Sequence, residues 1–502
     1  MLFLRLKSQK VVGMKRVAFL SLSIITFLVF QNPVRAQSKG YQIGVTIKGL
    51  HDTTAILGHY LGKSMYPDDT TKLDQNGQGT FTGKATLTEG LYIIYLPTGQ
   101  YFEMMMGADQ KFTISADTAN FVKSLQAEGS PDNNIFFDFQ RYMLGKRPEM
   151  EALQKELKAA TKDKDKQKLE DKMVAMNNEK IEHIKKIIKE NPDLFVSTFL
   201  NATVDIEVPK DIQSDKEKSY EYYKDHYFDN FNLSDVRLLY TPLYEEKLNF
   251  YLDKIVLQIP DSLIKEIDMI VNKAKVDSSL FRFVLITLFN KYAKSQIMGM
   301  DAVQVHIADK YYIPGAWWSD EKFITDLKER VDILKPLLLG NTAPDVQLRY
   351  VPAEHFKEAE NDTALKRYPH AGSFFNISQI DAKYTVLIFW EATCSHCKKA
   401  VPDLYKIYED TLKAMGVKVI AISTLFGEDG KEKWVDFVNK HQLYDWINAW
   451  NPYDYKYKVT YDVRSTPQIY VLDKDKKIIG KKLGPEQIVE FLTMYKKHIS
   501  KE

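Results

Sequence analysis

A pair of cysteines three positions apart constrains this chain more than any other feature. Cys394 and Cys397 are its only cysteines, and they follow an apolar run, 384–389, that is typical of a buried strand. After the pair, apolar residues recur at helical spacing over 400–407, with one proline among them. This order places Cys394 at a helix N-terminus, where unpaired N–H groups and the helix dipole favour an anion. Because the thiolate is the reactive form of cysteine, the pattern predicts a nucleophile.

The length and composition indicate several globular domains. At 502 residues the chain is longer than one hydrophobic core normally serves, and its hydrophobic fraction of 44% excludes wholesale disorder. The formal net charge of +2 is nearly neutral for a chain of this size. The composition therefore gives no reason to expect nucleic acid or another strongly anionic partner.

The N-terminus has the pattern of an export signal. Met14-Lys15-Arg16 is a basic start, residues 17–30 are mostly apolar, and Val34-Arg35-Ala36 has small or aliphatic residues at the positions that a signal peptidase reads. The apolar run is shorter than the ~20 residues that span a bilayer. We therefore expect a cleaved signal peptide over 1–36 and a periplasmic location, with an uncleaved anchor helix as the alternative.

An exported location bears on the cysteine pair. Structural disulfides are common in oxidising compartments, but they stabilise most when they close a long loop. A bridge between Cys394 and Cys397 closes a very short loop and would stabilise the fold little. The pair is therefore interpreted as a site of thiol–disulfide exchange.

Residues 37–128 show the two-residue alternation of half-buried strands. Four runs share this pattern or are continuously apolar: 41–47, 78–83, 91–96 and 111–114. Turn signals such as the one at 74–77 separate them. We predict a small antiparallel β sandwich without a catalytic constellation.

Residues 129–335 show the spacing of amphipathic helices. Apolar stripes run through 150–157 and 169–188, and the polar break at 162–166 between them indicates a helical hairpin. The many Lys and Glu residues are most simply explained as solvated helix faces. We predict an all-α region.

Residues 336–502 return to alternating strands and helices. The strand before the cysteines is followed by a strand at 417–423, a helix around Trp434, a hairpin over 468–480 and a closing amphipathic helix from Ile488. The predicted fold class is therefore multidomain, with an N-terminal β sandwich, a central all-α region and a C-terminal α/β domain.

Several short motifs in the last domain form a set, namely Ala343-Pro344-Asp345, Phe389-Trp390, Cys394 with Cys397, Pro402, and Ser465-Thr466-Pro467-Gln468. With this set, the domain resembles the periplasmic thiol–disulfide oxidoreductases of the TlpA and ResA type. The resemblance implies a thioredoxin fold and dithiol chemistry that needs no cofactor beyond the two cysteines. It also implies disulfide-containing periplasmic proteins as partners, and a membrane thiol carrier as the electron donor.

The resemblance assigns roles to individual residues. The last proline of the set is cis in this family and faces the disulfide, so Thr466 and Pro467 are expected to contact the substrate, together with Trp390. Cys394 is expected to be the exposed nucleophile and Cys397 the buried thiol that resolves the mixed disulfide. Whether the protein reduces, oxidises or isomerises disulfides stays open.

Two residues near the pair are candidate modulators. The imidazole of His396 could stabilise the Cys394 thiolate, and Glu391 could relay the proton that the second thiol loses. Each could also be a solvated surface residue. The chain departs from related proteins at two positions, because Ala400 replaces a glutamate of respiratory members and Ile388 replaces the buried aspartate of cytosolic thioredoxins.

Other functions fit the sequence less well. A zinc site needs four ligands and the chain has no second cysteine pair, so we expect no metal. A thiol peroxidase of the peroxiredoxin class would carry proline and threonine or serine where Leu387 and Glu391 stand. A non-catalytic binding protein remains an alternative, since most of the chain lies outside the C-terminal domain.

Overall fold

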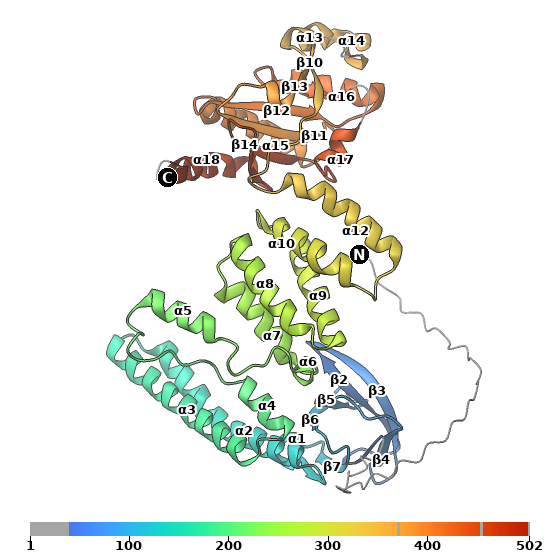
Figure 1. Cartoon of the computed structure of the whole chain (residues 1–502), viewed down its shortest axis with the longest axis vertical. Coiled ribbons are helices and arrows are strands. Elements are labelled where there is room, and N and C mark those ends of the chain that lie inside the picture. The colour runs from blue at the N-terminus through green and yellow to red at the C-terminus, as the bar shows by residue number, and fades with distance from the viewer. Residues whose placement is uncertain (1–39, 369–371, 452–454, 500–502) are drawn as a thin grey trace, which may run out of the picture.

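The computed structural model describes residues 40–368, 372–451 and 455–499 (Figure 1). The sheets and helices of residues 40–340 form one part of the molecule, and the α/β domain with the cysteines forms the other. The predicted signal peptide over 1–36 lies outside the described residues. Among the described residues, every helix is too short or too polar to cross a bilayer.

Two four-stranded sheets come first among the described residues. Their strand orders are β4-β1-β7-β8 and β3-β2-β5-β6. The first sheet contains β1 (Tyr41–Lys48), β4 (Gln78–Gly83), β7 (Lys111–Asp117) and β8 (Gln126–Glu128). The second contains β2 (Thr53–Leu61), β3 (Ser64–Leu73), β5 (Gly90–Tyr95) and β6 (Tyr101–Met106). Alternate residues of β1 are buried, as the two-residue period predicts.

The prediction that this region is entirely antiparallel is wrong at one pair of strands. β1 lies parallel to β7, with Gln42 opposite Lys111 and Lys48 opposite Asp117. The alternation of apolar residues shows which face of a strand is buried, but it does not show the strand's direction. Between β1 and β7 the chain forms the second sheet and also β4 of the first, which provides the long connection that a parallel pair requires.

Helices follow the sheets as far as Leu334. The first long ones, α2 (Pro131–Ala159) and α3 (Asp163–Glu190), form the predicted hairpin, in which Lys146 reaches Glu179 at 2.7 Å. The later helices are α4 (Phe195–Ala202), α5 (Lys216–His226), α6 (Val236–Leu239), α7 (Pro242–Phe250), α8 (Pro260–Ala274), α9 (Ser278–Ala293), α10 (Met300–Ile307), α11 (Ile313–Gly315) and α12 (Glu321–Leu334). A short helix, α1 (Phe121–Ser124), precedes β8.

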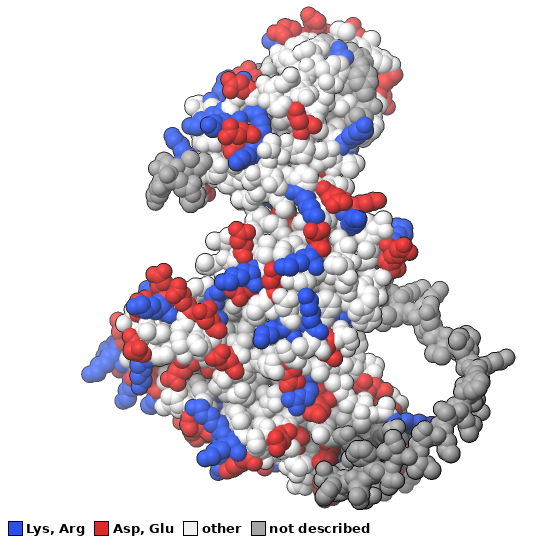
Figure 2. Space-filling view, in the orientation of Figure 1, with Lys and Arg blue, Asp and Glu red and all other residues white. Residues whose placement is uncertain are grey.

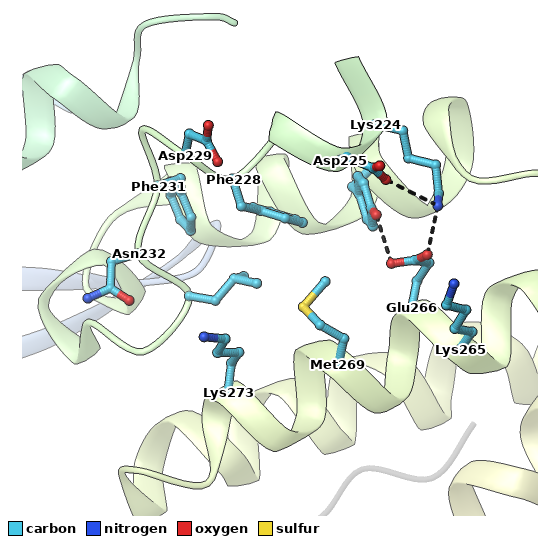
Figure 3. Close-up of a pocket in the computed structure, with 12 residues that line it drawn as sticks. Lys224, Asp225, Phe228, Asp229, Phe231, Asn232, Lys265, Glu266, Met269 and Lys273 are labelled. Atoms are coloured by element: carbon cyan, nitrogen blue, oxygen red, sulfur yellow. Dashed lines mark hydrogen bonds and ion pairs between the residues drawn. The ribbon is translucent and has the colours of Figure 1, made fainter. Parts of the chain in front are cut away.

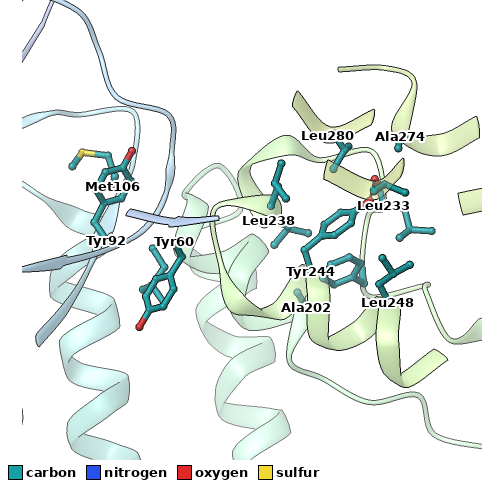
Figure 4. Close-up of a cluster of buried hydrophobic side chains, with 14 of the residues drawn as sticks. Tyr60, Tyr92, Met106, Ala202, Leu233, Leu238, Tyr244, Leu248, Ala274 and Leu280 are labelled. Atoms are coloured by element: carbon teal, nitrogen blue, oxygen red, sulfur yellow. Dashed lines mark hydrogen bonds between the residues drawn. The ribbon is translucent and has the colours of Figure 1, made fainter. Parts of the chain in front are cut away.

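The sheets and the helices share one hydrophobic core. A single cluster of buried side chains runs from Ile43 to Leu334. Figure 4 shows Tyr60 and Tyr92 of the second sheet in this cluster, together with Leu238 and Tyr244 of the helices. Because burial of apolar surface is the main favourable term in folding, the two regions stabilise each other.

The start of α2 covers the edge of the second sheet. Ser130 caps this helix by accepting a hydrogen bond from the N–H of Asn133. The Asn133 amide in turn accepts a hydrogen bond from the N–H of Met105 at 2.8 Å and donates one to the carbonyl of Met105 at 2.8 Å. This side chain thus replaces a neighbouring strand at the edge formed by β6, where unpaired backbone groups would otherwise be open to other chains.

The C-terminal domain is built on a seven-stranded mixed sheet with the order β10-β9-β13-β12-β11-β14-β15. The strands are β9 (Gln347–Tyr350), β10 (Phe374–Asn376), β11 (Tyr384–Trp390), β12 (Val417–Ser423), β13 (Ile447–Trp450), β14 (Gln468–Leu472) and β15 (Ile478–Lys481). The helices are α13 (Ala353–Glu358), α14 (Thr363–Arg367), α15 (Cys397–Ile407), α16 (Gly427–His441), α17 (Lys456–Thr460) and α18 (Ile488–Ile499).

Helices cover both faces of this sheet. β11 is buried along its whole length. Val386 and Ile388 belong to a cluster that contains residues of α15, α16 and α18, whereas Leu387 and Phe389 belong to a cluster on the other face. A strand buried on both faces reads as a continuous apolar run, which explains the pattern seen in the sequence.

The two parts of the molecule meet through polar contacts. The Lys481 ammonium on β15 contacts the Asp301 carboxylate on α10, and both side chains are almost fully buried. Lys482 donates to the carbonyl of Ser295 at 2.9 Å. Elsewhere, charged side chains of both signs are interspersed over the face shown in Figure 2.

Candidate active site

The two cysteines lie where β11 passes into α15. β11 ends at Trp390, and α15 begins at Cys397. The carbonyl of Cys394 already accepts a hydrogen bond from the N–H of Lys398 at 3.0 Å. Helical bonding therefore begins at Cys394, and its thiol lies beside the unpaired N–H groups of the first helical turn.

The two thiols have different environments. Cys394 is partly exposed, whereas Cys397 is fully buried. Burial opposes ionisation of Cys394, but hydrogen bonds from the backbone N–H of Cys397, the side chain of Thr466 and the backbone N–H of His396 hold its pKa below the ordinary value. Burial raises the pKa of Cys397 to about 12, although the backbone N–H of Glu391 acts in the opposite direction. The first thiolate to form is thus that of Cys394.

The turn before β14 completes the surroundings of Cys394. The Cys394 thiol donates to the carbonyl of Thr466 with an Sγ–O distance of 3.2 Å. The Thr466–Pro467 peptide bond is cis, as the resemblance implies. Both residues of the turn are partly exposed, so a ligand of Cys394 can reach them. Their contact with a substrate stays a prediction.

Trp390 does not have the predicted role. The side chain is fully buried, and its ring lies 5.1 Å from that of Phe437 on α16. A fully buried side chain cannot contact a substrate, so the prediction for Trp390 is wrong. The residue is the last of a strand buried on both faces, and it supports the active-site turn from the core.

Glu391 lies in the turn itself and has two partners that the sequence did not reveal. Its carboxylate accepts a hydrogen bond from the Thr424 hydroxyl at 2.7 Å, and Lys458 Nζ lies 3.9 Å away. Thr424 directly follows β12, the parallel neighbour of β11. Because the carboxyl ends of neighbouring parallel strands lie side by side, the contact between Thr424 and Glu391 could have been predicted. Lys458 lies on α17, and no sequence signal connects it with the cysteines.

His396 contacts the site through its backbone. The residue is exposed, and within the described part of the chain its ring forms no hydrogen bond or ion pair. The N–H of His396 is among the groups that lower the pKa of Cys394. A contribution of the imidazole ring stays a prediction.

We expect a His396→Ala variant to raise the pKa of Cys394 if the ring contributes, because the variant loses a group that stabilises the thiolate. The disulfide of the variant would also be less oxidising, since its reduced form is less stable. Thiolate absorbance against pH, in wild type and variant, measures the change. An unchanged titration would mean that His396 lowers the pKa of Cys394 only through its backbone N–H.

A cavity of about 670 Å³ lies in the helical region between α5 and α8 (Figure 3). Some of its polar groups pair with one another: the buried Glu266 contacts Lys224 at 2.9 Å and accepts a hydrogen bond from the Tyr251 hydroxyl at 2.8 Å. All its lining residues fall between Lys224 and Lys273, so the cavity is separate from the dithiol site. Within the described residues, no cluster of His, Cys, Asp and Glu is suited to hold a metal ion.

The domain that contains the site is similar to known proteins. Residues 381–478 match the model of a family described as thioredoxin-like. The thiol-disulfide oxidoreductase ResA of Oceanobacillus iheyensis is 28% identical over 106 residues, which are 21% of this chain and 45% of that protein. The crystal structure of a domain of a possible thiol-disulfide isomerase from Cytophaga hutchinsonii is 30% identical, and the match covers 34% of this chain and 99% of that domain with a TM-score of 0.27. By these matches the C-terminal domain is thioredoxin-like and TlpA/ResA-like.

The similarity to thioredoxin-like proteins concerns the C-terminal domain. The chain spans less than half the length of the ResA relative. A thioredoxin-like protein from Bacteroides caccae matches more of the chain, 58%, and 98% of that protein, at 20% identity and a TM-score of 0.43. Residues 41–136 and 158–332 match two families that are each described as a domain of unknown function. The sheets and helices before the thioredoxin-like domain thus have no function assigned by similarity.

Proposed function

We propose that this protein is an exported thiol–disulfide oxidoreductase, which uses Cys394 and Cys397 to reduce or exchange disulfides in periplasmic proteins. The observation that carries the proposal is the asymmetry of the two thiols. Cys394 is partly exposed with a lowered pKa, and Cys397 is fully buried with a pKa raised to about 12. One thiol is thus suited to attack a substrate, and the other to react only within the protein.

The proposed reaction has two exchange steps. The Cys394 thiolate attacks one sulfur of a substrate disulfide, which forms a mixed disulfide and releases one substrate thiolate. Cys397 then loses its proton and attacks Cys394 Sγ, which releases the second substrate thiolate. Two electrons pass to the substrate, and the protein is left with a Cys394–Cys397 disulfide. The reaction requires no cofactor, but an external thiol donor must reduce the protein again.

The second step needs a proton acceptor, because a thiol with a pKa of about 12 ionises rarely at neutral pH. We assign this role to Glu391, the partly buried carboxylate in the active-site turn. The Thr424 hydroxyl and Lys458 hold this carboxylate in place. The backbone N–H of Glu391 contacts Cys397, and the carboxylate of the same residue is the proposed acceptor of the proton as the Cys397 sulfur attacks.

The proposed location and partners follow from the N-terminal segment. A signal peptide over 1–36 would deliver the protein to the periplasm, where disulfide-containing proteins are available as substrates. Glutathione does not buffer that compartment, so a membrane thiol carrier is the proposed electron donor. N-terminal sequencing of the exported protein tests the cleavage before Gln37.

An insulin-reduction assay tests the proposed activity. The reduced wild-type protein is expected to precipitate insulin in the presence of dithiothreitol faster than dithiothreitol alone, because its thiolate attacks the insulin disulfides. A Cys394→Ser variant is expected to show only the background rate. Wild type that stays at the background rate would overturn the proposed activity.

A further inference from the structure

Asp462 connects the helical region to the loop between α17 and β14, which contains Thr466 and Pro467 and is called the active-site loop below. This residue lies between α17 and β14 and has a positive φ of 47°, a conformation that Asp and Asn adopt more readily than most residues. Its carboxylate receives two parallel hydrogen bonds from Arg330 on α12, with N–O distances of 2.7 and 3.0 Å. It also accepts a hydrogen bond from Arg464 Nε at 2.8 Å. The Asp462 side chain is only 16% exposed.

The Arg330 pair has the geometry that makes such contacts effective. Two parallel N–H···O bonds between a guanidinium and a carboxylate fix the relative orientation of the two groups. Most exposed single-contact ion pairs contribute little, but a forked pair that is partly shielded from water is the favourable case. The forked contact therefore fixes the position of Asp462 relative to Arg330 across the boundary between the two parts of the molecule.

A short path leads from this junction to the nucleophile. Arg464 lies two residues before Thr466, whose carbonyl is 3.2 Å from Cys394 Sγ. Gln468, the first residue of β14, donates to the carbonyl of Tyr461 at 2.8 Å, which ties the two ends of the loop together. With its ends fixed, the position of this loop determines how closely the Thr466–Pro467 turn approaches Cys394.

The helical region also contacts the strand next to β14. Lys481 and Lys482 lie on and just after β15, the strand paired with β14, and both contact the helical region. The helical region thus contacts both the strand paired with β14, through Lys481, and the loop that precedes β14, through Asp462. A movement of the helical region relative to the C-terminal domain would therefore displace both contacts.

We propose that Arg330 is a positioning residue of the dithiol site: through Asp462 it holds the Thr466–Pro467 turn against Cys394. The helical region, to which similarity assigns no function, would then set the reactivity of a thiol that it does not touch. This inference rests on the proposed function only for its relevance in the cell. The effect of Arg330 on the reactivity of Cys394 can be measured without a substrate.

The expected effect follows from what the turn contributes. The Thr466 side chain lowers the pKa of Cys394, whereas the contact in which the thiol donates to the Thr466 carbonyl acts in the opposite direction. Because a hydrogen bond to a charged group is stronger than one from a neutral thiol, loosening the turn should on balance destabilise the thiolate. In an Arg330→Gln variant we expect the pH of half-maximal alkylation of Cys394 to rise by about half a pH unit, which is about a threefold fall in thiolate on the acid side of the titration. The Cys394–Cys397 disulfide should also become less oxidising, because the reduced form is less stable.

The experiment uses the full-length reduced protein. Iodoacetamide alkylation of Cys394 is followed by peptide mass spectrometry as a function of pH, and the reduction potential is measured alongside it. Asp462→Asn, which keeps a residue type that tolerates the positive φ, should change both quantities in the same direction as Arg330→Gln. The double variant should change them no more than the larger single variant, because Asp462→Asn already breaks the contact that Arg330→Gln removes. Arg330→Lys, with a single contact in place of the fork, should lie between wild type and Arg330→Gln.

Lys322→Gln is the matched control. Lys322 is on the same helix, α12, and its ion pair with Asp326 stays within that helix. This variant should alkylate as wild type does. The proposal is overturned if Arg330→Gln and Asp462→Asn, with far-ultraviolet circular dichroism spectra like that of wild type, keep the wild-type alkylation profile and potential. It is also overturned if Lys322→Gln shifts both equally. Neither result depends on insulin reduction, so failure of this inference is distinguishable from failure of the proposed function.

Discussion

A Cys397→Ser variant is expected to accumulate covalent complexes with substrate proteins, whereas a Cys394→Ser variant should accumulate almost none. In the first variant, the Cys394 thiolate still attacks a disulfide, but no second thiol resolves the mixed disulfide. In the second, the remaining thiol is fully buried and has a pKa of about 12. At pH 7 such a thiol is ionised to on the order of one part in a hundred thousand.

Non-reducing electrophoresis of extracts that contain each variant would reveal the complexes. Dithiothreitol should release the trapped proteins, and mass spectrometry can then identify them. The Cys394→Ser/Cys397→Ser double variant is the control for association without a disulfide. Equal trapping by the two single variants would contradict the roles assigned to the cysteines.

A Lys481→Met variant is expected to lose about 3–5 kcal/mol of unfolding free energy, the usual cost of removing one partner of a buried ion pair. Lys481 and Asp301 expose only 6% and 10% of their side chains. Asp301 Oδ1 has no hydrogen-bond partner among the described residues, so without Lys481 the carboxylate would be buried and unpaired. Methionine keeps most of the apolar stem and removes the charge.

Denaturant unfolding followed by tryptophan fluorescence measures this loss. Lys482→Met is the matched control, because the neighbouring lysine is exposed and contacts only a backbone carbonyl of the helical region. A Lys481→Met/Asp301→Leu double variant should recover much of the stability, since an apolar pair of similar volume replaces the ionic one. If Lys481→Met and Lys482→Met were equally stable, the buried pair would not have the importance assigned to it.

The parts of the fold that the sequence predicted are those with a strong local pattern. The run at 384–389 is continuously apolar because β11 is buried on both faces, so its type and position were evident. β3 was not predicted, because it lies at a sheet edge and most of its residues are exposed, which removes the alternation. It also contains Pro67, which pairs with Gly58 where the register shifts, a position at which proline is tolerated.

In the candidate site too, residues with a local sequence pattern were predicted and residues without one were not. Cys394, Cys397 and the Thr466–Pro467 turn were found because short motifs mark them. Thr424 and Lys458 carry no motif, and they reach Glu391 only because the sheet and α17 bring distant segments together. Arg330 is further still, since its partner is 132 residues away in the sequence. Contacts of this kind depend on the tertiary fold, and a single sequence does not contain the information to predict them.

The parallel pairing of β1 with β7 has a consequence for the order in which the chain folds as it is synthesised. β1 lies inside its sheet, between β4 and β7, yet β7 begins only at Lys111. Until that segment has been made, one edge of β1 presents unpaired backbone groups that other chains can bind. Pairing of distant segments is also intrinsically slow. The first sheet is therefore completed late in synthesis. A shortened version of this protein that ended before β7 would leave one edge of β1 unpaired and prone to aggregation.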